Sequence, residues 1–166
     1  MTLNQVVFNP IGVVTRGIDA IGKYSIRSKI EFVGEVEIFD EYLEALDGIE
    51  EYSHVYIISF LHKAERRTIT NASRHGGPSR IGVFSTRYPR RPNPIGLSLV
   101  EIVGVDGGRL SLRGLDLYTG TPVLDIKPYD YHSIVCKPRV PRWLYEMWAE
   151  KRSIYEEYGW PGPFCS

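Results

Sequence analysis

The alternation of apolar and polar residues along this 166-residue chain predicts a series of short strands separated by turns. Apolar runs with the length and the β-branched or aromatic content of strands occupy residues 11–14, 33–39, 55–61, 81–84, 95–105 and 109–113. In the last of these runs Leu110 and Leu112 alternate with polar residues, so both should point to the core. Residues 97–105 are apolar or small nearly throughout, which is typical of a strand buried on both faces.

Turn and helix signals connect these strands. Residues 106–108, Asp-Gly-Gly, predict a hairpin turn because glycine adopts positive φ without steric cost. Asp40 stands where an N-cap belongs, Leu43 and Leu46 follow at helical spacing, and Gly48 suits a left-handed cap. We therefore expect a mainly β fold: a single antiparallel β-barrel domain with a short helix after the early strands and a C-terminal helix.

The end of the chain follows a helical pattern. Pro141 suits the first position of a helix. Apolar residues at helical spacing follow it and form one stripe: Leu144, Met147, Trp148 and Tyr155. Trp143 and Trp160 fall off this stripe, so the helix should pack on the barrel or on a partner subunit. We divide the chain into a barrel domain, residues 1–135, and a helical tail, residues 136–166.

Charge and cysteine content narrow the class of protein. The 20 basic and 20 acidic residues give a formal net charge of zero, which argues against a uniformly cationic nucleic-acid binder. Acidic residues nevertheless gather between residues 31 and 51 and basic ones between 63 and 91, so a basic face could attract phosphates. Cys136 and Cys165 match no metal or redox spacing, and no run of 18 apolar residues could span a membrane. We expect a cytoplasmic protein with reduced thiols, no metal and no membrane contact.

The most distinctive stretch is residues 81–101, IGVFSTRYPRRPNPIGLSLVE. Between its two apolar runs lies a loop with three prolines and a set of polar residues suited to anions: Arg87, Arg90, Arg91 and Asn93. Proline fixes its own φ and restricts the residue before it, so this loop should be stiff and extended. Guanidiniums on a stiff loop lose little entropy when they bind an anion. The alternative is a proline-rich surface turn with solvated arginines.

Generic nucleotide and metal motifs are missing: the chain has no GxGxxG, no GxxxxGK[ST] and no HExxH. The residues after the hairpin can still carry chemistry. Asp125 and Lys127 would share one face of a strand that continues to Tyr129, and Asp125 could accept or orient a proton. Gly120 would let a ligand approach the backbone of residues 117–121. The alternatives are a structural Asp–Lys pair and an ordinary turn glycine.

Three groups of residues together resemble the signatures of the TsaA-like family, the tRNA-methyltransferase O group. They are GVFSTR with RPNPIG at residues 82–87 and 91–96, LDLYTGTPVLDIKPY at 115–129, and GIEEYSH with FLH at 48–54 and 60–62. They cover most of residues 10–130 in the family's order. The resemblance implies an S-adenosylmethionine-dependent methyltransferase on a small β-barrel. It also implies a homodimer and methylation at N6 of a threonylcarbamoyl-modified adenosine next to the tRNA anticodon.

The resemblance also implies roles for individual residues. Those expected to bind the cofactor are His62, Arg91, Asn93, Leu117, Tyr118, Thr119, Gly120 and Thr121. Those expected to take part in catalysis are Asp125, Lys127 and Tyr129. Those expected to bind tRNA are Arg66, Arg67, Arg87 and Arg90. Lys127 or Arg87 could hold a carboxylate or phosphate of the substrate.

The chain departs from the family pattern in two places. Residues 15–29 read as a loop and lack the Pro-Arg-Gln-type segment that usually helps to enclose the cofactor. We also expect no separate C-terminal domain of the kind that bacterial relatives often add. Two further functions therefore stay open: a non-catalytic barrel that binds RNA or a nucleotide, and a methyltransferase of the same scaffold that acts on a small molecule.

Overall fold

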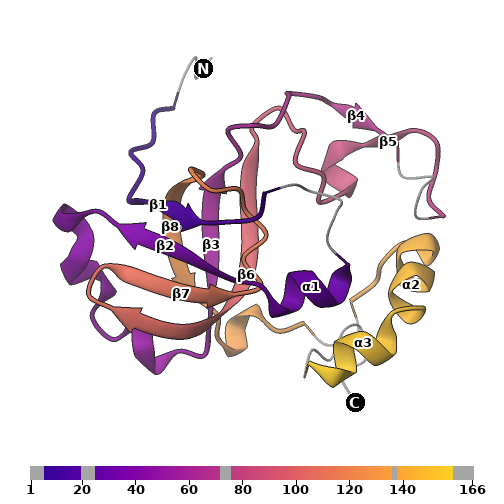
Figure 1. Ribbon diagram of the computed structural model, residues 1–166. Coiled ribbons are helices and arrows are strands. Elements are labelled where there is room, and N and C mark those ends of the chain that lie inside the picture. The colour runs from indigo at the N-terminus through magenta and orange to yellow at the C-terminus, as the bar shows by residue number, and fades with distance from the viewer. Residues whose placement is uncertain (1–5, 20–24, 72–75, 136–137, 159–166) are drawn as a thin grey trace. The chain divides into compact units, whose positions relative to one another are not determined.

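The computed structural model describes residues 6–19, 25–71, 76–135 and 138–158, and within these residues six strands close into a barrel (Figure 1). Neighbouring strands pair antiparallel in the order β1-β2-β7-β6-β3-β8. The strands are β1 Gly12–Arg16, β2 Val33–Ile38, β3 His54–Phe60, β6 Ile95–Asp106, β7 Arg109–Arg113 and β8 Pro122–Pro128. The expected mainly β fold with an antiparallel barrel is confirmed.

Alternation along the strands fills the barrel with aliphatic side chains. The inward residues are almost fully buried: Val14, Val36, Val55, Ile57, Val100, Leu110, Leu112 and Val123. The register explains their contact, because Val36 lies opposite Leu110 and Val55 lies opposite Val100. Residues directly opposite in an antiparallel pair point to the same side of the sheet. The inward orientation expected for Leu110 and Leu112 is confirmed.

The long strand β6 differs from its prediction. Its N-terminal half pairs with β3 and its C-terminal half with β7, so the strand is part of the barrel wall. In a barrel wall, side chains point alternately to the interior and to the exterior, and only one face of the strand is covered. Gly96 and Val100 are buried, whereas Leu97 is 51% exposed. The prediction of burial on both faces was wrong. The hairpin from β6 to β7 was correct, and Gly107 adopts a φ of 54° there.

The short helix after the early strands is present as the 3₁₀ helix η1, Asp40–Leu46, followed by η2, Ile49–Glu51. Its N-cap is Phe39 rather than Asp40, and no side chain caps it. Asp40 is instead the first helical residue, where a carboxylate still interacts favourably with the helix dipole. Gly48 has a φ of 81°, as expected for a left-handed cap.

Residues 15–29 are not the simple loop that was expected. Strand β1 reaches Arg16, Ile18 forms a parallel bridge with Tyr118, and helix α1 spans Ile26–Glu31. The helix forms because Ser25 is an N-cap whose hydroxyl accepts a hydrogen bond from the Ser28 amide at 3.0 Å. Residues 20–24 lie outside the described part of the chain.

The apolar run at residues 81–84 is also not a single buried strand. Strand β5, Ile81–Gly82, pairs with β4, Ile69–Thr70, and the chain then turns into the 3₁₀ helix η4, Val83–Ser85. The Thr86 hydroxyl donates to the Val83 carbonyl at 2.9 Å and closes this turn. As a result Val83 is buried, whereas the neighbouring Phe84 points to solvent.

The chain divides into two compact units. The barrel unit comprises Met1–Lys63 and Ile95–Tyr129, and the loop-and-tail unit comprises Ala64–Pro94 and Asp130–Ser166. The tail contributes η5, Tyr131–Ser133, and two helices, α2, Arg142–Ala149, and α3, Arg152–Glu157. The C-terminal helix was expected, although Pro141 stands at the N-cap of α2 rather than inside it. The division of the chain at residue 135 stays a prediction, and Trp160, Cys136 and Cys165 lie outside the described residues.

Candidate functional site

The segment between β7 and β8 is held against the start of the barrel. Leu117 is buried in the core, and its carbonyl accepts a hydrogen bond from the Ile18 amide at 2.8 Å. Val14 makes two backbone hydrogen bonds to this segment: its amide donates to the Thr121 carbonyl at 3.0 Å, and its carbonyl accepts from the Gly120 amide at 2.8 Å. The segment is therefore held along β1 by backbone hydrogen bonds and is not a loose loop.

A glycine that sequence reasoning did not single out makes this close approach possible. A Cβ at Gly17 would lie 2.5 Å from the Thr119 amide nitrogen and 2.6 Å from the Tyr118 carbonyl carbon, so a larger residue would not fit. The Gly17 amide donates to the Thr119 hydroxyl at 2.9 Å. Gly120 is the opposite case: it adopts a φ of 82°, and no atom lies within 4 Å of where its Cβ would be. The backbone at Gly120 is therefore open to an approaching ligand.

The end of β3 places a cation on this turn. Lys63 Nζ lies 4.5 Å from the centroid of the Tyr118 ring, within range of a cation–π interaction. His62, beside it, is exposed, and its amide donates to the Phe60 carbonyl at 2.8 Å. Sequence reasoning placed His62 and Tyr118 in the cofactor site, but it counted Lys63 only among the basic residues that could attract phosphates. The only local signal was a basic residue directly after the FLH motif.

An irregularity in β8 decides which way the expected catalytic residues face. Val123 pairs with Ser59 and Asp125 with Ile58, so one residue of β8 between them has no partner on β3. A bulge of this kind shifts the alternation by one residue. Ile126 therefore packs against the core, and Lys127 shares the outer face with Asp125.

The two charged residues on that face form a close pair. Lys127 Nζ lies 2.8 Å from Asp125 Oδ2, and the other carboxylate oxygen accepts the Ile126 amide at 2.9 Å. The expected placement on one face is thus found in the structure. Because both oxygens already accept donors, the carboxylate has a fixed orientation on the barrel surface.

Tyr129 lies on the same outer surface. Its amide donates to the His54 carbonyl at 3.1 Å, and its ring meets the Tyr56 ring edge-on at 5.6 Å. Tyr56 pairs directly with Lys127, so their side chains point to the same side of the sheet. The three residues expected to take part in catalysis, at positions 125, 127 and 129, therefore share one surface with Tyr56.

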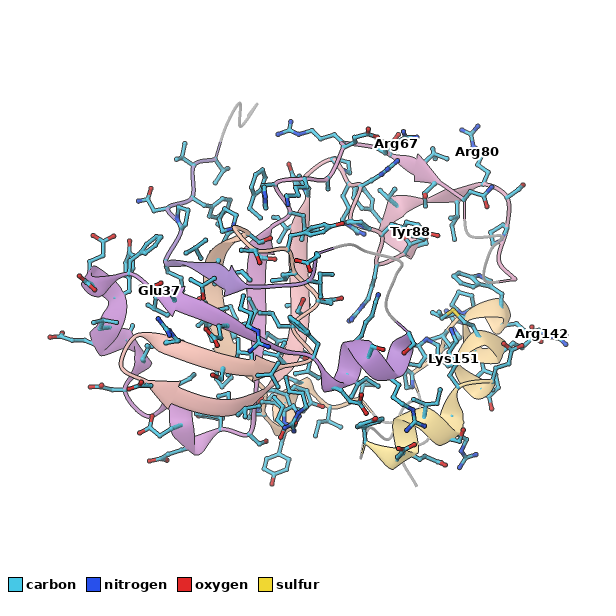
Figure 2. The ribbon with its side chains drawn as sticks, viewed as in Figure 1. Glu37, Arg67, Arg80, Tyr88, Arg142 and Lys151 are labelled. Carbon is cyan, nitrogen blue, oxygen red and sulfur yellow. The ribbon has the colours of Figure 1, made fainter. Side chains whose placement is uncertain are left out.

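In the loop-and-tail unit, Arg91 braces the proline-rich loop. Its Nη1 donates to the Thr86 carbonyl at 2.7 Å and to the Tyr88 carbonyl at 3.2 Å. Tyr88, labelled in Figure 2, in turn donates its hydroxyl to the Asn71 carbonyl at 3.1 Å. Within the described residues, no hydrogen bond occupies the Nε–Nη2 edge of Arg91. Asn93 is exposed. These bonds brace the loop, so the stiffness expected from the prolines should also depend on the Arg91 guanidinium.

The arginines expected to bind RNA fall into two kinds. Glu65 lies 3.0 Å from Arg67 and 3.3 Å from Arg90, and these ion pairs neutralise part of the basic charge. The hydrogen bond from Arg67, followed by the charges of Arg90 and Arg67, lowers the pKa of the Glu65 carboxyl below its ordinary value. Arg66 and Arg87 are exposed, and neither has an ion-pair partner among the residues that the structure describes. Figure 2 shows Arg67 and Arg80, which precede β4 and β5 respectively.

Three structural findings bear on other kinds of site. Across residues 6–19, 25–71, 76–135 and 138–158, no three His, Cys, Asp or Glu side chains are placed to hold a metal ion. No helix in these ranges has the length and hydropathy needed to cross a membrane. A surface cavity of about 380 Å³ lies between η2 and the second half of β6, and none of the expected site residues lines it.

Comparison with known proteins agrees with this fold. Residues 25–133 match the family model of the tRNA-methyltransferase O N-terminal domain. A probable S-adenosyl-L-methionine-binding protein of Methanothermobacter thermautotrophicus is 44% identical over 131 residues, which are 75% of this chain and 90% of the relative. The mouse tRNA (adenine(37)-N6)-methyltransferase is 46% identical over 101 residues, which are 58% of this chain but only 23% of the mouse protein.

A solved structure supports the same assignment. The crystal structure of TrmO from Pseudomonas aeruginosa superimposes with a TM-score of 0.67 at 34% identity, covering 83% of this chain and 62% of that one. The barrel and the resemblance seen in the sequence are thereby confirmed. The roles of individual residues stay predictions. The chain belongs to the family of the tRNA-methyltransferase O N-terminal domain.

Proposed function

We propose that this protein is an S-adenosylmethionine-dependent methyltransferase that methylates N6 of a threonylcarbamoyl-modified adenosine next to the anticodon of tRNA. The observation that carries the proposal is the family match over residues 25–133. This range includes both the braced segment 83–94, called the Pro–Arg loop below, and the turn at 117–121. Relatives named as S-adenosylmethionine-binding proteins and as tRNA N6-methyltransferases support the cofactor and the substrate class.

Each unit, taken by itself, has residues that fit a part of the cofactor. Arg91 keeps the Nε–Nη2 edge of its guanidinium for a carboxylate, since only Nη1 is used by the loop. Asn93 is exposed and can both donate and accept. The open backbone at Gly120, with the Thr119 hydroxyl beside it, suits the edge of an adenine ring. When bound, the cofactor supplies a methyl group on a positively charged sulfur.

The transfer itself requires alignment more than strong binding. When N6 receives the methyl group that the cofactor would supply, N6 would have to give up one proton. We assign Asp125 as the acceptor of this proton, because its carboxylate is fixed by Lys127 and its own backbone. Arg87, which is exposed, is assigned to a phosphate of the tRNA substrate. Positioning of this kind supplies roughly 7–11 kcal/mol of the barrier.

We also propose that the protein acts as a homodimer in the cytoplasm, where tRNA is used. Phe60 pairs with Ile95, and the next outward pair is Ile58 with Leu97, which together leave an apolar outer surface on β3 and β6. Contiguous exposed apolar surface of this kind marks interaction sites. Leu97→Asp should yield monomers in light scattering, whereas Val7→Asp, at an exposed valine before β1, should not.

The activity is tested by incubating the protein with methyl-labelled cofactor and two tRNA pools, one with and one without the threonylcarbamoyl modification. Mass spectrometry of the digested nucleosides should find the label on the modified adenosine of the first pool only. Label on an unmodified adenosine would overturn the substrate assignment. Cofactor binding with label on small molecules alone would indicate a small-molecule methyltransferase, and RNA binding without cofactor binding would indicate a non-catalytic barrel.

A further inference from the structure

An aromatic side chain on the Pro–Arg loop is left in solvent. Phe84 is 81% exposed, although hydrogen bonds hold the backbone on both sides of it. Val83 is buried, and its amide donates to the Thr68 carbonyl at 3.1 Å. The Thr86 amide and hydroxyl both donate to the Val83 carbonyl, at 3.1 and 2.9 Å. The exposure of Phe84 is therefore imposed by a braced backbone and is not the result of a loose segment.

One fixed cation lies over this ring. The guanidinium carbon of Arg91 lies 5.9 Å from the ring centroid, and Arg91 is itself fixed by the two loop carbonyls. This distance is within the range of a cation–π interaction. Arg87 and Arg90 follow on the same short loop and are exposed. An exposed flat apolar face beside Arg91, followed by exposed arginines in the sequence, matches a ligand that has a flat π-system next to negative charge.

We infer that Phe84 is a stacking platform for an unpaired purine base of an RNA loop, with Arg87 on the neighbouring phosphate. This inference rests on the proposed function and adds a base-binding subsite to it. Sequence-specific and single-stranded RNA recognition commonly uses aromatic side chains on which splayed bases stack. The cofactor also contains a purine, but the wide exposure of Phe84 and the adjacent exposed arginines favour a base that is attached to a phosphate backbone.

The experiment measures binding of a fluorescent anticodon stem-loop RNA by anisotropy over a series of salt concentrations. Phe84→Ala and Phe84→Leu should each bind roughly five- to 150-fold more weakly than the wild type, whereas Phe84→Trp should bind at least as well. Phe39→Ala is the matched control, because Phe39 is also exposed but lies beside Asp40 and Glu41. Its affinity for RNA should not change.

The salt dependence separates stacking from phosphate binding. Phe84→Ala should keep the wild-type slope of log affinity against log salt, whereas Arg87→Ala should reduce that slope by about one. Because Phe84 is exposed, its variants should keep the wild-type melting temperature. Unchanged RNA affinity of Phe84→Ala, or wild-type affinity of Phe84→Leu, would overturn the inference while leaving the proposed function intact.

Two further outcomes distinguish failure of the RNA subsite from failure of the proposed function. Calorimetric titration with S-adenosylhomocysteine tests the other source of a purine. A loss of affinity for this compound in Phe84→Ala, with RNA affinity unchanged, would show that the ring stacks on the cofactor and would overturn the RNA subsite. If the wild-type protein fails to bind the stem-loop at all, the proposed tRNA function itself is overturned together with its subsite.

Discussion

Gly17→Ala is the substitution that tests most directly how the candidate cofactor turn is held. The added Cβ would lie 2.5 Å from the Thr119 nitrogen and 2.6 Å from the Tyr118 carbonyl carbon, and it would clash with the Leu117 carbonyl oxygen as well. These are backbone atoms, which cannot move aside as the end of a flexible side chain can. The chain at Gly17 and the turn must therefore separate.

The expected destabilisation follows from the contacts that this separation removes. Forcing an extra carbon into a packed site raises the free energy of the folded state by about 1–3 kcal/mol. The hydrogen bonds from Gly17 to Thr119 and from Ile18 to Leu117 would also be lost, at about 1 kcal/mol each. The free energy of unfolding should fall by about 3–5 kcal/mol, and the melting temperature by roughly 6–20 °C.

Thermal unfolding followed by circular dichroism measures this change. Gly104→Ala is the matched control, because no atom lies within 4 Å of where its Cβ would be and its backbone does not require positive φ. It should melt within a few degrees of the wild type. At a temperature where Gly17→Ala is still folded, its affinity for S-adenosylhomocysteine should also be lower than that of the wild type. A melting temperature of Gly17→Ala equal to that of the control would refute the account of the turn.

The remaining predictions concern three charged residues. Arg91→Lys should weaken cofactor binding at least tenfold in calorimetry with the barrel's circular dichroism unchanged, because an ammonium lacks the planar fork that serves the loop and a carboxylate together. The pKa of Glu65 in the folded protein is below its ordinary value. As the pH falls, its ion pairs should therefore survive past the pKa of the unfolded chain and be lost only at the lower pKa of the folded state. NMR titration of the Glu65 carboxyl can follow this loss. Glu65→Gln should therefore tighten RNA binding at neutral pH and steepen its salt dependence, since two arginines lose their partner. Asp125→Asn should lower kcat by about 10²–10⁴-fold without changing cofactor affinity; normal turnover would remove Asp125 from catalysis.

The strands that could be predicted are those in which the local pattern and the tertiary environment agree. Leu110 and Leu112 alternate with polar residues, and the barrel buries both. Strand β6 could not be predicted in the same way, because Ile95 and Leu97 are apolar yet face outward. An apolar residue indicates that a face avoids water, but it does not say whether the same domain or another molecule covers that face.

The bulge in β8 left a signal that was overlooked. Val123 and Ile126 both pack inward although they are three residues apart, which the two-residue period of a regular strand does not allow. Apolar residues at that spacing indicate either a helix or a bulged strand. With a bulge, Asp125 and Lys127 both lie on the outer face of the strand. By contrast, the contact of Gly17 with Thr119 joins positions 102 residues apart and has no local signature.

Arg91 shows why assigning one role to one residue falls short at this loop. The sequence suggested that prolines supply the stiffness and that Arg91 supplies the charge. In the structure, Nη1 of Arg91 also stabilises the loop, since it donates hydrogen bonds to two carbonyls of that loop. The guanidinium is planar, so fixing Nη1 also fixes the direction of the Nε–Nη2 edge. The geometry of the loop and its readiness for an anion are therefore set by the same bonds, and this coupling explains why arginine, rather than any cation, suits the position.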